Sequence, residues 1–250
     1  MDTKINKMDH NKTSYEYEYR FSCPIRMISV APSGFGKTNR LFKMFESADQ
    51  MFDNPRQFDT IIYYYSTWSE TFNEYKYMVT EWINKLPSVQ DISIKLKEYD
   101  RNGSGITVVV DDFMGETSSD IQDIFTKYAR NTNVSIILLW QDLFPAGRKN
   151  AVATICRIIK RQCTDLIVFK NILDKQQFIN FARRFMPQRF RELTQLYNKV
   201  TNKPYSYLWI DCRTFTENKF RILSRVCPDE WPMKMYIFDI DDILYEEDDF

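Results

Sequence analysis

Short runs of apolar residues recur along the chain, each separated from the next by a polar or helix-like stretch. Strands of a parallel sheet are covered on both faces, so they read as near-continuous apolar runs. The first five predicted strands are 25–30, 58–66, 106–112, 134–141 and 165–170. Two later strands, 205–211 and 220–226, are expected to close the sheet.

Between the apolar runs, apolar residues recur at the spacing of one helix face. These faces comprise Leu41, Met44 and Phe45; Ile121, Ile124, Phe125 and Tyr128; Phe178, Phe181, Ala182 and Phe185; and Leu193, Leu196, Tyr197 and Val200. Ser119 followed by Gln122 has the pattern of a capping box at a helix start. Residues 70–87 predict a further helix that ends at Pro87, whereas 88–104 are mixed and end in a loop.

Strands that alternate with helices predict an α/β fold with a mostly parallel central sheet. A chain of 250 residues can bury one good core. We expect a loosely ordered arm at 1–20, the core domain at 21–228 and an acidic tail at 229–250.

Composition excludes several classes of protein. The 34 basic and 34 acidic residues balance, so the distribution of charge matters more than its sum. Five scattered cysteines without a CxxC pair, and the single His10, argue against a disulfide framework and a zinc site. The N-terminus lacks a signal-peptide pattern, and no apolar run approaches a membrane span. We therefore expect an intracellular protein that does not enter membranes.

The window from Ala31 to Thr38 resembles the phosphate-binding loop G-x-x-x-x-G-K-[ST], with alanine in place of the first glycine. Gly36 would let the backbone wrap a phosphate, Lys37 would reach the β- and γ-phosphates of ATP, and Thr38 would bind Mg²⁺. The predicted nucleotide-binding residues are Ser33, Gly34, Phe35, Gly36, Lys37, Thr38 and Asn39. The alternative is an ordinary strand-to-helix turn.

Two adjacent carboxylates end the third predicted strand. A phosphate loop needs a second acid on a neighbouring strand to hold Mg²⁺, and Asp111 fits that requirement. Asp112 is the candidate base that orients the attacking water, with Glu116 as a weaker alternative. Gln141 ends the fourth predicted strand. It could sense the γ-phosphate if that strand lies between the strand before the phosphate loop and the strand that ends in Asp111.

The segments "SGFGKT", "IIYYYS", "VVVDDF", "ILLWQDLF" and "DLIVFKN…DKQQ" together resemble the genome-packaging ATPases of double-stranded DNA viruses. These ATPases belong to the FtsK–HerA superfamily, and the sequence is most similar to those of large DNA viruses and Polinton-like elements. The resemblance covers about residues 24–211.

This resemblance implies a P-loop NTPase three-layer sandwich with strand order 5-1-4-3-2. It also implies a homo-oligomeric ring, a hexamer or pentamer, that drives double-stranded viral DNA into a preformed capsid with ATP and Mg²⁺. The expected partners are DNA and a capsid or portal protein. The expected location is the nucleus or a cytoplasmic virus factory of an infected cell, or the virion. Lys37, Thr38, Asp111, Asp112 and Gln141 match the family's functional positions; Asp112 stands where many relatives outside this branch carry glutamate.

Ring motors usually complete each site with an arginine from the next subunit. Arg148 is the first candidate here, followed by Arg157 and Arg161, although each could instead be a surface or DNA-contacting arginine. Residues 148–191 carry 11 basic and 2 acidic side chains, a net of 11 − 2 = +9. Such a stretch could track a phosphate backbone without reading sequence, or could form solvated helix faces.

The last residues, 239–250, are acidic and contain no basic side chain. They predict a solubilising tail, or else a docking peptide or a nucleic-acid mimic that covers the basic stretch until assembly. Two other functions remain open from the sequence. One is a P-loop kinase of a nucleotide or small molecule; the other is a non-catalytic scaffold that a nucleotide locks.

Overall fold

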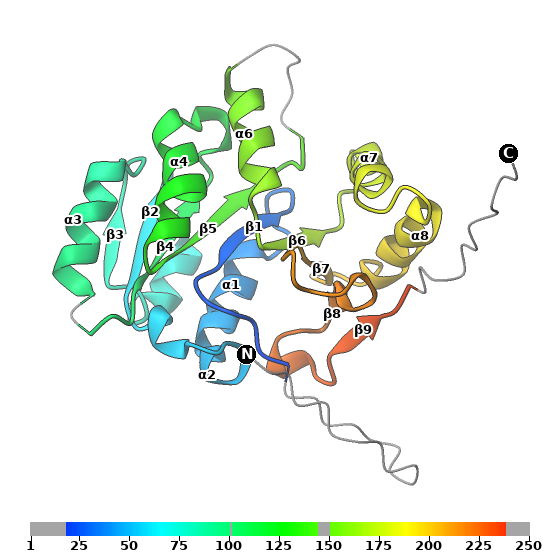
Figure 1. Cartoon of the computed structure of the whole chain (residues 1–250), viewed down its shortest axis with the longest axis horizontal. Coiled ribbons are helices and arrows are strands. Elements are labelled where there is room, and N and C mark those ends of the chain that lie inside the picture. The colour runs from blue at the N-terminus through cyan, green and yellow to red at the C-terminus, as the bar shows by residue number, and fades with distance from the viewer. Residues whose placement is uncertain (1–18, 101, 145–150, 239–250) are drawn as a thin grey trace, which may run out of the picture.

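A nine-stranded sheet forms the centre of the computed structural model, in the order β3-β2-β4-β5-β1-β6-β7-β8-β9 (Figure 1). The structure describes residues 19–238 except 101 and 145–150. The strands are β1 Arg26–Val30, β2 Ile61–Tyr65, β3 Glu81–Ile83, β4 Ile106–Asp111, β5 Val134–Trp140, β6 Asp165–Phe169, β7 Tyr207–Asp211, β8 Ile222–Ser224 and β9 Lys234–Tyr236. The helices are α1 Lys37–Glu46, α2 Ala48–Met51, α3 Val89–Tyr99, α4 Ser119–Asp123, α5 Ala129–Asn131, α6 Ala151–Arg161, α7 Lys175–Phe185 and α8 Phe190–Val200.

The predicted strand order is confirmed. The first five predicted strands are β1, β2, β4, β5 and β6, and read from β6 they run 5-1-4-3-2. All of their pairings are parallel, so their carboxyl ends meet at one edge of the sheet. β7 and β8, the two late strands, continue the sheet with antiparallel pairing, and β9 adds an edge strand that the apolar pattern did not indicate.

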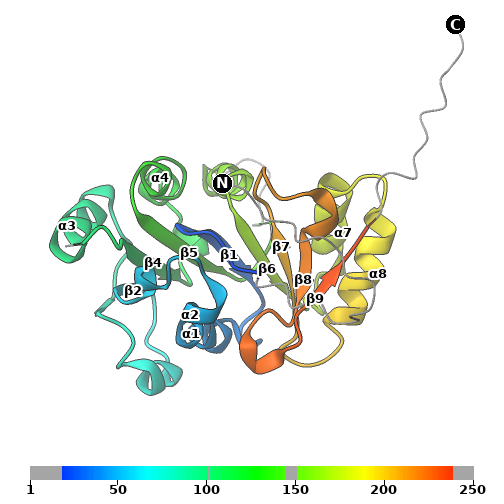
Figure 2. The same cartoon turned by 60° about the horizontal axis from the view of Figure 1, so that its bottom comes forward.

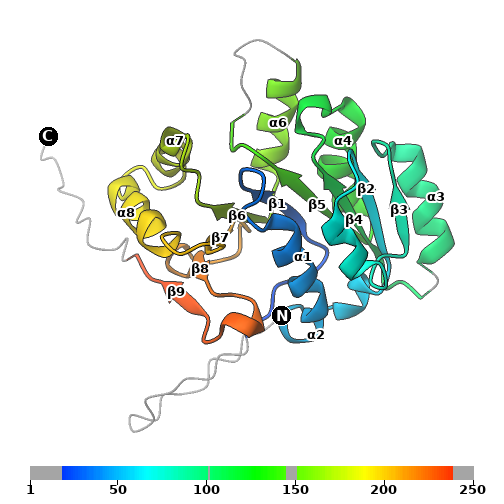
Figure 3. The same ribbon diagram turned by 180° about the vertical axis from the view of Figure 1, so that it is seen from behind.

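Helices cover both faces of the sheet, which gives three layers (Figure 2). On one face, α1 and α2 pack apolar side chains against β1, β2 and β5. On the other face lie α3, α4 and α6, and α7 pairs with α8 beside β7. Seen from behind, α3 and β3 lie at one end of the sheet, and α8 and β9 lie at the other (Figure 3).

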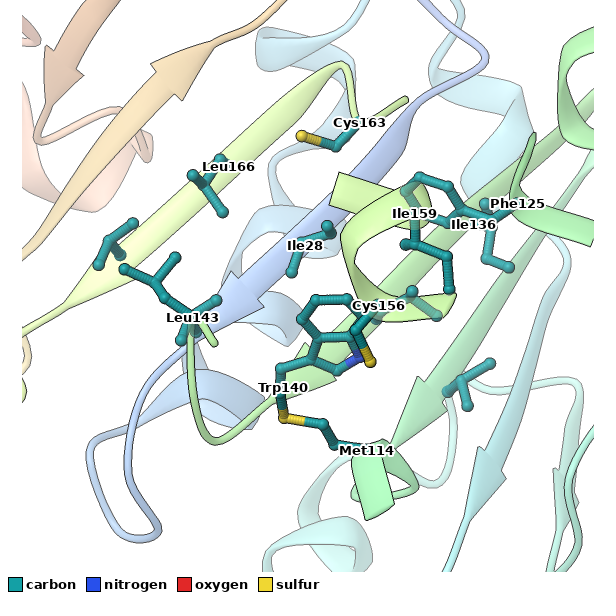
Figure 4. Packing of buried hydrophobic residues seen from close by; sticks show 14 of the residues in the cluster. Ile28, Met114, Phe125, Ile136, Trp140, Leu143, Cys156, Ile159, Cys163 and Leu166 are labelled. Atoms are coloured by element: carbon teal, nitrogen blue, oxygen red, sulfur yellow. The ribbon is translucent and has the colours of Figure 1, made fainter. Parts of the chain in front are cut away.

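The covered face beneath α6 shows how the core is built (Figure 4). Cys156 and Ile159 of α6 point toward Ile28 of β1 and toward Ile136 and Trp140 of β5, and all five are almost completely buried. Burial of an aliphatic side chain of this size contributes about 1.5–3 kcal/mol, so this packing holds α6 on the strands that carry the site.

The predicted helix at 70–87 is wrong. The chain instead forms a 3₁₀ turn, Glu70–Tyr75, and then β3, which pairs in parallel with β2. The aromatic residues explain the difference, because Phe72 and Trp82 pack around Tyr63 of β2, with ring centroids 5.2 Å and 4.8 Å from that of Tyr63. This tertiary packing outweighs the local helical pattern.

Two helix starts also differ from the sequence expectation. Residues 88–104, considered mixed, contain α3, whose start is fixed by a capping box between Ser88 and Asp91. In the helix at 119, the capping residue is Ser118, whose hydroxyl accepts from the backbone N–H of Ile121. The continuation of that helix, Ile124–Tyr128, is a π-helix.

The first part of the segment expected to be an acidic tail is folded onto the domain. β9 lies within it, and Phe238 is buried. Asp229 and Glu230 form ion pairs with Arg40 of α1 at 3.1 Å and 3.0 Å. The folded unit therefore extends to residue 238, and residues 239–250, like 1–18, lie outside the described residues. None of the helices in the described part of the chain is long and apolar enough to cross a bilayer.

Candidate nucleotide site

The turn between β1 and α1 has the backbone of a phosphate-binding loop. Gly34 and Gly36 have φ of 79° and 84°, in the left-handed region that favours glycine. Gly36 is the N-cap of α1 and offers no side-chain cap to the helix. The first N–H groups of α1 therefore point into the turn, where they and the helix dipole favour an anion.

Lys37, the first residue of α1, folds back over this turn. Its ammonium group donates hydrogen bonds to the carbonyl oxygens of Ala31 and Pro32. Burial lowers the pKa of Lys37, and the nearby Asp111 and Asp112 partly offset that effect. Because a phosphate oxygen is a stronger, charged acceptor than a carbonyl, a bound nucleotide can replace these two bonds.

Asp111 ends β4 and is held by a tyrosine from the neighbouring strand β2. The Tyr63 hydroxyl donates to Asp111 Oδ2 at 2.7 Å. Burial raises the pKa of Asp111 to about 6, although the Tyr63 hydrogen bond and the Lys37 charge oppose the shift. Burial and the Asp111 charge in turn raise the pKa of Tyr63, and a hydrogen bond from the Thr38 side chain partly offsets this. The side chains of Thr38 and Asp111 therefore both lie beside the Tyr63 hydroxyl.

The donor set of Thr38 and Asp111 fits a magnesium ion. Mg²⁺ prefers oxygen ligands, and it usually combines one or two protein carboxylates or hydroxyls with phosphate oxygens and water. A divalent cation beside Asp111 would also stabilise the charged carboxylate that burial disfavours. A phosphate-loop site requires such an acid on a neighbouring strand, and Asp111 meets that requirement.

Asp112 and Gln141 are joined by a hydrogen bond. The Gln141 amide donates to Asp112 Oδ1 at 2.6 Å. Asp112 has φ of 63°, a conformation uncommon for a residue with a side chain, and is solvent-exposed. Gln141 directly follows β5, and β5 lies between β1 and β4, as the proposed sensor position required.

These groups line one cavity of about 610 Å³ at the carboxyl ends of the strands. The predicted residues that line it are Ser33, Gly34, Gly36, Lys37, Thr38, Asn39, Asp111, Asp112 and Gln141. Phe35 instead packs against the core beneath α1. Glu116, the weaker candidate base, lies in a 3₁₀ turn away from this lining.

The structure brings none of the described arginine candidates to the cavity. Arg157 donates to Ala153 and Thr154 of its own helix α6. Arg161 is exposed at the end of α6, and Arg148 lies outside the described residues. An arginine contribution from a second subunit stays a prediction.

Sequence reasoning missed several lining residues. Thr67, Ser69 and Thr71 follow β2, and the strand-end rule that found Asp111 could have found these hydroxyls. Arg40 lies about one helical turn after Lys37 on α1, so helical spacing could have placed it on the same side as Lys37. Tyr205, from the turn before β7, carries no local signal.

The strand order, the turn and the position of the acid pair decide the fold. It is that of a P-loop NTPase. The fold expected from the resemblance to FtsK–HerA ATPases is thus observed in this chain.

The sequence matches no protein-family model and no curated protein. Among solved structures, the chain is similar to the genome packaging NTPase B204 from Sulfolobus turreted icosahedral virus 2 in complex with AMP, with 15% identity, a TM-score of 0.43, and coverage of 74% of this chain and 91% of that one. It is also similar to the cytoplasmic domain of EssC, with 13% identity, a TM-score of 0.43, and coverage of 95% and 45%. A third is the Legionella pneumophila ATPase DotB, with 11% identity, a TM-score of 0.35, and coverage of 71% and 52%. All three similarities are distant.

Proposed function

We propose that this protein hydrolyses Mg-ATP and uses the energy to move double-stranded DNA, as a ring of identical subunits. One observation carries the catalytic part of the proposal. Lys37 and Thr38 on the phosphate loop face Asp111, Asp112 and Gln141 across a single cavity. Phosphoryl transfer needs mainly positioning and charge neutralisation, and this arrangement supplies both.

In the reaction, the oxygen of a water molecule bonds to the γ-phosphorus while the bond to the β–γ bridging oxygen breaks. Asp112 accepts the water proton, and Gln141 holds Asp112 Oδ1 so that the other carboxylate oxygen faces the water. Lys37 and the N-terminus of α1 hold the phosphates. Mg²⁺, which Thr38 and Asp111 would hold, would supply further charge neutralisation to the phosphates. The products are ADP and inorganic phosphate.

The basic stretch supports DNA as the partner. Its exposed members in the described chain are Arg157, Arg161, Lys175, Arg183, Arg184 and Arg191. They lie on α6, α7 and α8, away from the acidic residues of the site. Cations on exposed helix faces can bind a phosphate backbone without reading sequence, as packaging requires.

A structural path joins the site to these basic helices. The loop that begins at Gln141 continues to Leu143 and Phe144, whose backbone N–H groups both donate to the Gln177 side chain of α7. Lys160 of α6 and Arg184 of α7 lie over the Phe144 ring, 3.6 Å and 5.5 Å from its centroid. A movement of Gln141 on loss of the γ-phosphate would therefore reach the helices proposed to contact DNA. The sequence resemblance to packaging ATPases supports the viral capsid as the destination.

The test is the rate of ATP hydrolysis with and without Mg²⁺ and double-stranded DNA. We expect Mg²⁺-dependent hydrolysis that DNA stimulates, and its loss in Lys37→Ala. Lys97→Ala, on the exposed side of α3, is the charge-matched control and should hydrolyse ATP normally. Sedimentation with ATP should show an assembly larger than a monomer.

Other results would replace the proposal. Transfer of the γ-phosphate to a nucleoside in place of water would identify a kinase. Tight ATP binding without turnover, with function retained in both Lys37→Ala and Asp112→Asn, would identify a scaffold. Hydrolysis that DNA does not stimulate would remove the translocation part.

A further inference from the structure

Tyr205 lies directly against the phosphate loop, although it is far from that loop in the sequence. It belongs to the turn between α8 and β7. A Cβ atom added to Gly36 would lie 2.9 Å from Tyr205 Cδ1, so the ring packs on the glycine backbone. The absence of a side chain at position 36 is what allows this approach. One face of Gly36 thus meets an aromatic ring at the edge of the cavity.

The ring is available to a ligand. Tyr205 keeps 61% of its surface exposed despite the contact with Gly36. Its hydroxyl has no hydrogen-bond partner among the described residues. Among the described residues, the other aromatic side chain in the cavity lining is Phe72, which is 2% exposed and packs between Tyr63 and Trp82. Tyr205 is therefore the aromatic surface that the cavity offers.

The backbone at Tyr205 is unusual. Its φ is 61°, a conformation that costs free energy for a residue with a side chain and is common at ligand sites. The fold maintains it between the end of α8 and the start of β7, and Ser206 N–H donates to Lys203 O across the turn at 3.3 Å.

The order of the strands gives the direction in which a nucleotide lies. Asp111 on β4 and Gln141 after β5 are on one side of β1, whereas β6 and β7 are on the other. The γ-phosphate must face the acid pair, and the phosphate loop after β1 holds the middle of the triphosphate. The sugar and base then extend toward β6 and β7, where Tyr205 lies. Arg40, on the same side, is engaged by Asp229 and Glu230.

We propose that Tyr205 is the surface on which the nucleobase of the bound nucleotide packs. This inference rests on the proposed function, because it assumes that the phosphate loop binds a nucleoside triphosphate. Stacking on an aromatic ring tolerates any base, since every base has a π-face. The site should therefore bind ATP and GTP with similar affinity.

The experiment compares two ligands by titration calorimetry in the presence of Mg²⁺: ATP, and inorganic triphosphate, which has no base. Tyr205→Ala should weaken ATP binding by about 5- to 150-fold, the range for loss of one stacked base. The same variant should bind triphosphate within about twofold of the native chain. Tyr205→Phe, which keeps the ring, should bind ATP close to the native affinity. Phe215→Ala removes an aromatic residue that is 74% exposed and outside the cavity, and should change neither ligand.

Two results would overturn the inference. Equal weakening of ATP and triphosphate in Tyr205→Ala would mean that the ring only shapes the phosphate loop. Unchanged ATP binding would mean that the base packs elsewhere. If the native chain bound neither ligand, the proposed function would fail first, and this would be evident before any variant was measured.

Discussion

Gln177 of α7 holds the loop that follows Gln141, and its removal gives a sharp test of the structure. Its side-chain oxygen accepts from the backbone N–H of Leu143 at 2.7 Å and of Phe144 at 3.3 Å. Its amide donates to the carboxylates of Asp142 at 2.9 Å and Asp174 at 3.0 Å. Gln177→Ala would break all four bonds at once.

The size of the effect follows from what loses its partner. A buried donor left without a partner costs about 1–3 kcal/mol. Leu143 is 3% exposed, so its N–H should carry most of that cost. The longer bond to Phe144 and the two bonds to carboxylates are half-buried, where water can replace them. We expect Gln177→Ala to lower the free energy of unfolding by about 2–4 kcal/mol.

A second variant separates hydrogen bonding from charge. Gln177→Glu keeps an acceptor for the two N–H groups but loses both donors and places a third carboxylate beside Asp142 and Asp174. Repulsion between like charges should destabilise it near pH 7, and protonation of the new carboxyl should reduce the deficit as the pH falls toward 4. An uncharged variant such as Gln177→Ala should not show this recovery.

The assay is urea unfolding followed by circular dichroism, with Gln176→Ala as the control. Gln176 is the exposed neighbour, and within the described chain its side chain donates a hydrogen bond to Asn180, one turn along α7. Its removal should cost less than about 0.5 kcal/mol. If Gln177→Ala cost no more than the control, the loop would not depend on this side chain. If Gln177→Glu were as stable as the native chain at pH 7, the charge argument would be refuted.

Two further predictions concern buried charges. Arg213→Met should lower the free energy of unfolding by about 3–5 kcal/mol, because Arg213 pairs at 2.7 Å with the fully buried Asp165 and also with Asp211; a loss below about 1 kcal/mol in urea unfolding would contradict this. Asp111→Asn should raise the free energy of unfolding of the nucleotide-free protein at pH 8 by about 3 kcal/mol. Burial raises the pKa of Asp111 from the ordinary 3.8 to about 6 in the folded chain. The native chain therefore loses about 3 kcal/mol of stability as the pH rises through this range, and the uncharged asparagine does not. The Asn oxygen can still accept from Tyr63, and the advantage should fall to roughly half at pH 5; an advantage independent of pH would show that Asp111 is not desolvated.

The sheet and the acid pair could be predicted because both depend on local sequence. The strands β1, β4 and β5 are covered on both faces, so each reads as a mostly apolar run, and a carboxylate or an amide marks the end of β4 and of β5. Parallel pairing then brings these ends together. Asp111 and Gln141 follow from this rule without any knowledge of tertiary contacts.

The remainder depends on contacts between distant segments. The 70–87 segment has helical spacing. Trp82 nevertheless packs against Tyr63 and Phe72, and this burial stabilises the strand more than a solvent-exposed helix would be stabilised. In the sequence, Tyr63 is one aromatic residue among several in an apolar strand. In the sheet it lies opposite Val109, and its hydroxyl reaches Asp111 two residues further along β4. The position of Tyr205 in the site could not be predicted, because it depends on contact between the turn before β7 and the phosphate loop, which are far apart in the chain.

The charges of the site explain why metal and nucleotide should bind together. Arg40 and Lys43 are engaged by Asp229 and Glu230, which leaves Lys37 as the described cation that faces the acid pair. A triphosphate alone would bring several negative charges toward Asp111 and Asp112, and burial already disfavours the charged form of Asp111. A divalent cation held by Thr38 and Asp111 would turn this repulsion into attraction. ATP affinity should therefore fall steeply when Mg²⁺ is chelated, and the fall should be much smaller in Asp111→Asn, because the repulsion that the metal offsets is then absent.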